Sequence, residues 1–174
     1  MRAIKIIGAL LLFTACGGYN SIDNFYEMHK NDDQVTAIRV PQFMIALVGQ
    51  ISPEMQALVG TTKDLRYMQF PSASESQAKF LNDQMNGFTT GNFIEVFRKN
   101  DDLKRNVVAI REKKDVVKEI LIYNNDNIKG TFLYFNGNFD PAQVRQLAKN
   151  NEFQQFSNGL LPQLNLQTPG ISTD

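Results

Sequence analysis

The chain has 174 residues, of which 43% are hydrophobic and 10% aromatic. Such a composition is typical of a globular protein rather than a disordered one. The 18 basic and 18 acidic residues give a formal net charge of +0, so there is no electrostatic reason to expect a nucleic acid as partner. Cys16 is the only cysteine, which excludes an intramolecular disulfide.

The start of the chain predicts a lipoprotein signal. A short basic segment precedes an apolar run, Ile6 to Phe13, that is too short to span a bilayer. The run leads into Phe13-Thr14-Ala15-Cys16, which resembles a lipobox with phenylalanine where leucine is commoner. We therefore expect a cleaved signal peptide over residues 1–15, a lipid on Cys16 and a tether over residues 16–24. The alternative is a cysteine that happens to lie in an ordinary signal peptide.

The residue after the cysteine bears on the destination. Gly17 stands where an aspartate would hold a lipoprotein at the inner membrane. We therefore expect an outer-membrane lipoprotein of the cell envelope, which faces either the periplasm or the outside. Lipidation of Cys16 would also remove an unpaired thiol from an exported protein.

The first half of the chain alternates predicted helices and strands. Apolar residues at helical spacing, β-branched runs, serine caps and proline starts define these elements. In chain order we expect a helix over Ser21–Lys30, a strand over Val35–Val40, a helix from Pro41 to Val48 that continues or restarts at Pro53–Val59, a strand over Asp64–Phe70 and a helix over Ser72–Met85.

The second half predicts a β-meander. Short polar segments separate four β-rich runs, and consecutive strands with short links pair antiparallel. The runs are Ile94–Arg98, Leu103–Arg111, Val116–Tyr123 and Thr131–Phe135. A last helix follows, with Asp140 as its cap and Pro141 at its first position. The fold class expected is α+β: an antiparallel sheet packed against several helices on one face. Residues 25–150 form its single domain and residues 151–174 a flexible tail.

No catalytic signature is evident in the sequence. His29 is the only histidine, which excludes sites that need two imidazoles, and we expect it to be a packed core residue. Serine-hydrolase elbows and glycine-rich phosphate loops are absent. Asn124-Asn125-Asp126-Asn127 is oxygen-rich, but a turn explains it better than a calcium loop. We therefore predict no metal, no cofactor and no catalytic residue.

Several of these features together resemble a lipoprotein family of the Bacteroidetes catalogued as domain of unknown function 4252. They are the lipobox, the helix Phe25–Lys30, the strand Val35–Val40 that enters a proline-started helix, and the meander followed by Asp140–Val144. The resemblance covers Phe25 to Ala148. It implies a lipid-anchored α+β domain of unassigned activity, with genes often near alternative sigma factors and hence a role in envelope stress or signalling. It assigns no functional residue.

Two functional hypotheses remain. The first is a non-catalytic binding, assembly or signalling module, anchored to the membrane through Cys16, with a protein partner in the envelope. Its hallmark would be an exposed apolar patch on the sheet face, for which the candidates are Phe97, Tyr123, Phe132 and Tyr134. The alternative is a hydrolase that uses carboxylates such as Glu95 and Glu119, which requires a concave pocket with two acids. We favour the binding module.

Overall fold

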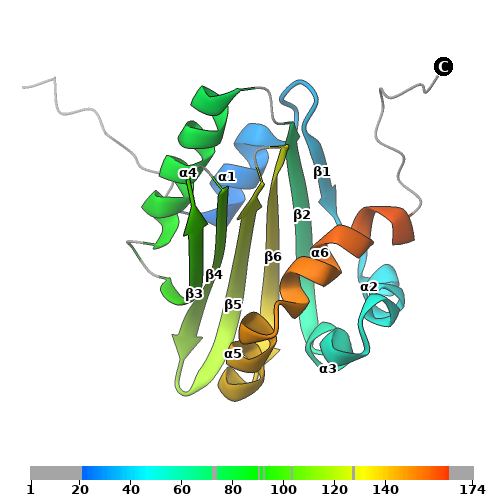
Figure 1. Cartoon of the computed structure of the whole chain (residues 1–174). Coiled ribbons are helices and arrows are strands. Elements are labelled where there is room, and N and C mark those ends of the chain that lie inside the picture. Colours follow the sequence, from blue (N-terminus) through cyan, green and yellow to red (C-terminus); the bar gives the residue numbers. More distant parts are fainter. Residues whose placement is uncertain are drawn as a thin grey trace, which may run out of the picture.

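The computed structural model describes residues 21–71, 74–89, 91, 93–102, 104–126 and 128–164. One antiparallel sheet of six strands, in the order β1-β2-β6-β5-β4-β3, forms its centre (Figure 1). The strands are β1 (Thr36–Arg39), β2 (Thr62–Pro71), β3 (Ile94–Asp101), β4 (Lys104–Lys113), β5 (Val116–Asn125) and β6 (Lys129–Phe139). The helices are α1 (Ile22–His29), α2 (Gln42–Val48), η1 (Gly49–Ile51), η2 (Pro53–Met55), α3 (Gln56–Gly60), α4 (Glu75–Thr89), α5 (Pro141–Lys149) and α6 (Glu152–Gln163).

The predicted α+β fold with a C-terminal meander is confirmed. Strands β3 to β6 follow one another in the chain and pair antiparallel with their sequence neighbours. The β4–β5 link is a two-residue turn in which Lys114 and Asp115 both have positive φ, 53° and 60°. Such a turn matches the right-handed twist of the strands it joins. Strand β2 then pairs with β6, and β1 completes the sheet.

The prediction that helices cover one face of the sheet is wrong, because helices cover both. Helices α1 and α4 pack on one face, against side chains such as Met68 and Phe132. On the other face, α2, α3, α5 and α6 pack against side chains such as Leu65 and Phe135. The physical reason is visible in β6, where Phe132–Phe135 are all buried. A strand with consecutive apolar residues needs cover on both faces.

The prediction of a flexible tail from residue 151 is also wrong for Glu152–Gln163, which form α6. Phe153, Phe156 and Leu160 are spaced three and four residues apart, so they share one face of this helix. All three are almost completely buried in the core, and both phenylalanine rings contact the ring of Phe135. Residues 165–174 lie outside the described part of the chain.

The predicted helix starts at Ser21 and Asp140 are confirmed. The Ser21 hydroxyl accepts a hydrogen bond from the Asn24 amide at 3.1 Å. The Asp140 carboxylate accepts one from the Gln143 amide at 2.7 Å, and Pro141 occupies the first helical position. None of the described helices is long and apolar enough to cross a membrane. The signal peptide and Cys16 lie outside the described residues.

Candidate functional site

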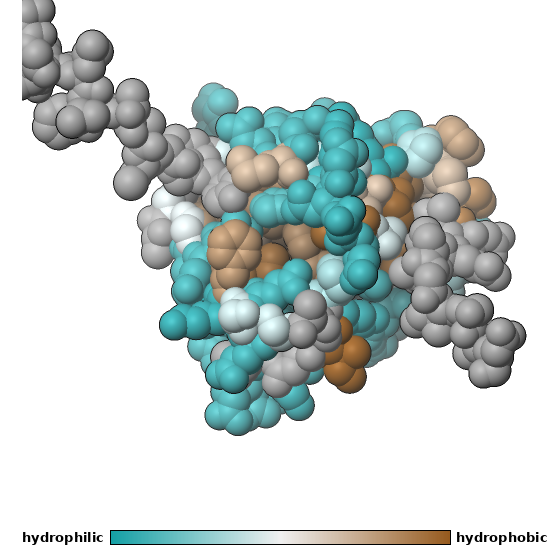
Figure 2. Space-filling model, turned by 90° about the horizontal axis from the view of Figure 1, so that it is seen from above, coloured by the Kyte–Doolittle hydropathy of each residue, from teal (hydrophilic) through white to brown (hydrophobic). Residues whose placement is uncertain are grey.

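A concave site lies at the end of the sheet where β3 turns into β4 and β5 approaches β6. Its volume is about 350 Å³, which is within the range of small ligand sites. Figure 2 looks onto this end of the molecule and shows a mainly hydrophilic surface with a hollow that has apolar residues at its floor. The pocket is lined by Phe97, Lys99, Asp101, Lys104, Arg105, Asn106, Asn124, Asn125, Asp126, Asn151 and Gln154.

Asn124 is the most informative residue of this pocket. It is 7% exposed, and only its main-chain carbonyl, which accepts from the Thr131 hydroxyl, takes part in a hydrogen bond outside the strand ladder. Among the described residues its side-chain amide has no hydrogen-bond partner, although it lines the pocket. A side-chain amide offers both donors and an acceptor. The Asn124 amide is therefore available to a group that enters the pocket.

The cationic side chains of the pocket differ in whether they already have partners within the protein. The Arg105 guanidinium donates to the Asn82 carbonyl and to the Asn86 side chain, both at 2.9 Å, and is thus held by α4. Lys99 and Lys104 are exposed, and neither belongs to an ion pair within the described chain. These two ammonium groups are free to meet an anion.

The start of α6 forms one wall of the pocket. Asn151 has φ 63° and makes no side-chain cap for the helix. The Asn106 side chain donates long hydrogen bonds to the side chains of Asn151 and Gln154, at 3.4 and 3.5 Å. Because amide groups both donate and accept, this wall can exchange these weak internal bonds for bonds to a polar ligand.

Asp126 has a structural role that supports the predicted turn. One carboxylate oxygen accepts hydrogen bonds from the amides of Ile128 and Lys129, both at 2.9 Å. This is the side-chain capping typical of aspartate in turns. Within the described residues no group of three or more His, Cys, Asp or Glu side chains could hold a metal ion.

The predicted sheet-face residues are only in part surface residues. Phe97 is partly buried and lines the pocket. Tyr123, Phe132 and Tyr134 are at most 6% exposed beneath α1 and α4, so the expectation that they form an exposed patch is wrong. The cause is again that α1 and α4 cover the second face of the sheet.

Tyr123 instead belongs to a buried polar network beside the pocket. Its hydroxyl donates to the Asn82 side chain at 3.0 Å and accepts from the Asn125 side chain at 3.2 Å. Burial raises the pKa of Tyr123 well above its usual range. This network ties α4 to β5 and fixes the Asn125 wall of the pocket.

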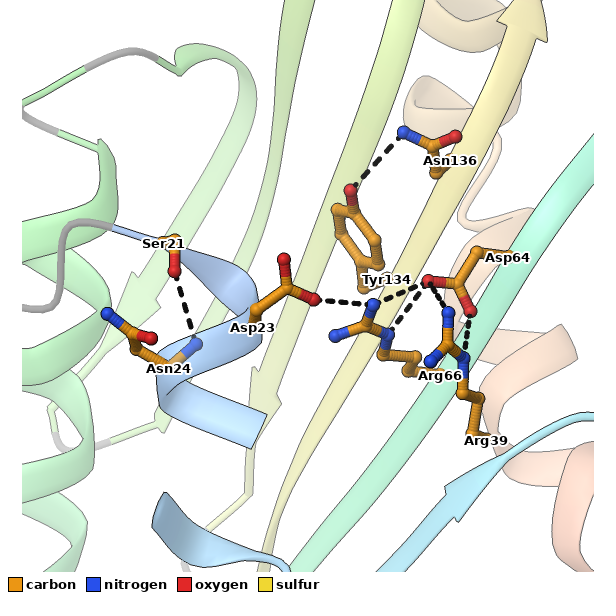
Figure 3. Close-up of polar contacts among 8 residues, drawn as sticks. All are labelled: Ser21, Asp23, Asn24, Arg39, Asp64, Arg66, Tyr134 and Asn136. Atoms are coloured by element: carbon orange, nitrogen blue, oxygen red, sulfur yellow. Dashed lines mark hydrogen bonds and ion pairs between the residues drawn. The ribbon is translucent and has the colours of Figure 1, made fainter. Parts of the chain in front are cut away.

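A second polar cluster, around Arg66, is held together by ion pairs within the chain (Figure 3). The Arg66 guanidinium lies 2.7 Å from the Asp23 carboxylate of α1 and 2.6 Å from the Asp64 carboxylate of β2. The rings of Tyr26 and Tyr134 lie 5.4 and 5.6 Å from its central carbon. Burial opposes the charge of Arg66, but the hydrogen bonds to both carboxylates outweigh it and raise the Arg66 pKa. We assign this cluster to the attachment of α1.

The candidate carboxylates of a hydrolase do not meet in the pocket. Glu95 pairs with Arg98, and this hydrogen bond lowers the Glu95 pKa. Glu119 lies 3.1 Å from Arg111. Neither glutamate lines the pocket. His29 is buried, as predicted, with its Nδ1 atom 2.6 Å from the Asp32 carboxylate.

Comparison with known families gives one match. The model of a family described as a domain of unknown function (DUF4252) matches residues 26–147, more than half of the chain. The chain belongs to the DUF4252 family. No curated protein and no solved structure matches significantly. The DUF4252 match runs from α1 into α5, so it includes the walls of the pocket on β3, β4 and β5, whereas Asn151 and Gln154 on α6 lie outside it.

Several pocket residues were not foreseen in the sequence analysis. Lys99 and Asn106 pair with each other across the β3–β4 hairpin, but Gln154 lies on α6, far away in the chain, and nothing in the sequence links it to them. Asn124 was treated as a turn residue, whereas it lies in β5. The one available signal was polarity: strands β3, β4 and β5 all become polar at the same end of the sheet.

Proposed function

We propose that this DUF4252 protein is a lipid-anchored protein of the cell envelope that binds a partner without catalysis, through the pocket at the β3–β4 end of the sheet. The observation that carries the proposal is the Asn124 side chain: the residue is only 7% exposed, its side chain lines the pocket, and its amide has no hydrogen-bond partner in the described chain. An amide that faces a pocket without a protein partner can both donate to and accept from a ligand that enters it.

The composition of the pocket favours binding over bond cleavage. It combines amide side chains, two uncommitted ammonium groups and one aromatic ring, Phe97. Of its two acids, Asp126 is engaged in the turn to β6. Asp101 is thus the one acid of the described lining without such a structural role, whereas glycoside hydrolysis requires two carboxylates.

The anchor is the second part of the proposal. The lipobox-like segment Phe13–Cys16 supports lipidation of Cys16 and attachment to the outer membrane. Incorporation of an alkyne-tagged fatty acid into the intact protein, and its loss in Cys16→Ser, would support the anchor. Equal labelling of both proteins, or no labelling of either, would contradict it.

The binding role is tested by capture of partners from the native envelope after cross-linking. Asn124→Leu keeps the volume of the side chain but removes its donor and acceptor. The matched control is Asn138→Leu, which changes an exposed asparagine near the opposite end of β6. We expect the captured partner to disappear for Asn124→Leu and to remain for the control. A partner that both variants retain at wild-type yield would overturn the pocket as the binding site.

A further inference from the structure

Strand β3 is an open edge of the sheet next to the pocket. It is the last strand in the sheet order and pairs only with β4. All eight of its residues are exposed or partly exposed, and Figure 1 shows no other strand beyond it. An edge strand presents a row of unpaired amides and carbonyls that can pair with another chain.

The pairing register limits which part of this edge is usable. A bulge between Glu95 and Phe97 interrupts the ladder to β4, and bulges discourage regular pairing on the outer side. From Phe97 to Asp101 the register with β4 is continuous. An added strand would therefore pair with this five-residue stretch.

The same stretch borders the pocket. Phe97, Lys99 and Asp101 alternate along β3, so their side chains lie on one face of the sheet, and all three line the pocket. A strand added beside β3 would place every second side chain on that face. Its side chains would thus enter the pocket while its backbone pairs with β3.

The charges of the pocket lining determine which side chains of an added strand would bind there. The ammonium groups of Lys99 and Lys104 have no ion-pair partner in the described chain, and Arg105 adds a third positive charge to the lining. The carboxylate of Asp126 is held in the turn by two backbone amides. Asp101 is then the one uncommitted acid among the described lining residues. The excess of positive charge favours an acidic occupant.

We propose that the partner of the pocket is an extended, acidic polypeptide segment that pairs with the outer edge of β3 at Phe97–Asp101 and places a carboxylate between Lys99 and Lys104. This inference rests on the proposed binding function and specifies its partner. Backbone pairing would supply affinity, and the lysines would select the acidic side chains.

The test uses the ¹⁵N-labelled protein and three synthetic probes. The first is a capped peptide of alternating glutamate and valine, the second has lysine in place of glutamate, and the third has proline in place of valine and so has fewer backbone donors. We expect the first probe to slow amide hydrogen exchange within Phe97–Asp101 and to shift the Asn124 side-chain signals. The lysine and proline probes should bind at least about tenfold more weakly.

Charge reversal tests whether Lys99 and Lys104, rather than the overall charge of the protein, attract the glutamate probe. In Lys99→Glu/Lys104→Glu, binding of the glutamate probe should weaken at least about tenfold. The matched control, Lys113→Glu, changes an exposed lysine at the opposite end of β4 and should leave the affinity unchanged.

The outcomes distinguish this inference from the proposed function. Shifts at Asn124 without protection of β3 would overturn strand pairing but keep the pocket as a binding site. Equal binding of the acidic and basic probes would overturn the charge selection. Protection of β3 that grows with protein concentration and without a probe would assign the edge to a second copy of the chain and overturn the acidic partner. Failure of all three probes to bind would also overturn this inference, whereas loss of the cross-linked partner in Asn124→Leu would still support the proposed function.

Discussion

At the scale of single residues, Arg66 shows how a buried charge is tolerated. Its side chain is 8% exposed, and it is met by two carboxylates and two aromatic rings. Removal of one partner from such a cluster leaves an uncompensated charge in a poorly solvated place. Asp64 also pairs with the exposed Arg39 at 2.9 Å, so two cations and two carboxylates share the charge of the cluster, and its most buried pair is Arg66 with Asp64.

We predict that Arg66→Met lowers the free energy of unfolding by about 2 kcal/mol, because Asp64, with a side chain only 16% exposed, loses its closest cation and keeps only the exposed Arg39, 2.9 Å away. Urea denaturation measures this change. Asp23→Asn is the control: the Asp23 side chain is 74% exposed, so the loss should stay below about 1 kcal/mol. An unchanged denaturation midpoint for Arg66→Met would contradict the assignment.

The buried tyrosines predict the behaviour at alkaline pH. Burial raises the pKa values of Tyr67, Tyr123 and Tyr134 above the usual value. Above pH about 10 the unfolded chain loses phenolic protons that the folded chain keeps, so the free energy of unfolding must fall as the pH rises. We expect tyrosinate absorbance of these residues to appear together with loss of the fold. Reversible ionisation of all tyrosines near pH 10 in the folded protein would contradict this prediction.

At the scale of elements, the contact of α6 with η1 depends on a glycine. A Cβ atom on Gly159 would lie 2.5 Å from Cγ2 of Ile51, which is well inside van der Waals contact. Alanine normally stabilises a helix relative to glycine, but here the helix would have to move away from η1 or Ile51 would have to change its rotamer.

We predict that Gly159→Ala lowers the free energy of unfolding by about 1–3 kcal/mol, as thermal denaturation would measure. Gly87→Ala on α4 is the matched control, since nothing lies within 4 Å of a Cβ atom there, and it should raise stability by about 0.5–1 kcal/mol. If both variants were stabilised equally, the close packing of α6 against η1 would be disproved.

The elements also show how far the sequence could be interpreted. Alternation and turn residues sufficed for the meander, because short polar links leave consecutive strands no other pairing than antiparallel. They did not predict α6, although Phe153, Phe156 and Leu160 have helical spacing, because the polar end of the chain favoured a flexible tail. Nor did they reveal the second helical layer. The consecutive apolar residues of Phe132–Phe135 carried that information, but the strand was interpreted as one-sided.

At the scale of the whole molecule, the pocket is a product of tertiary structure alone. Lys99, Asn124 and Gln154 come from β3, β5 and α6, and the polar end of each element is ordinary when considered by itself. The predicted meander places β3, β4 and β5 side by side, but only the packing of α6 closes the wall. The chemistry of the site therefore could not be predicted from spacing in the sequence.

The packing of α6 also predicts how far the chain must extend for the domain to fold. Figure 1 shows α6 lying across the sheet, where Phe153, Phe156 and Leu160 are at most 1% exposed. Each of these side chains contributes about 2 kcal/mol through burial, and their sum is comparable to the total stability of a typical domain, about 5–15 kcal/mol.

A chain that ends at residue 150 should therefore lose its cooperative thermal transition, whereas one that ends at Leu164 should keep it, because α6 is then complete. Circular dichroism during heating distinguishes the two. A cooperative transition at the same temperature in both chains would mean that the sheet and the other helices suffice, and that α6 serves the pocket but not the core.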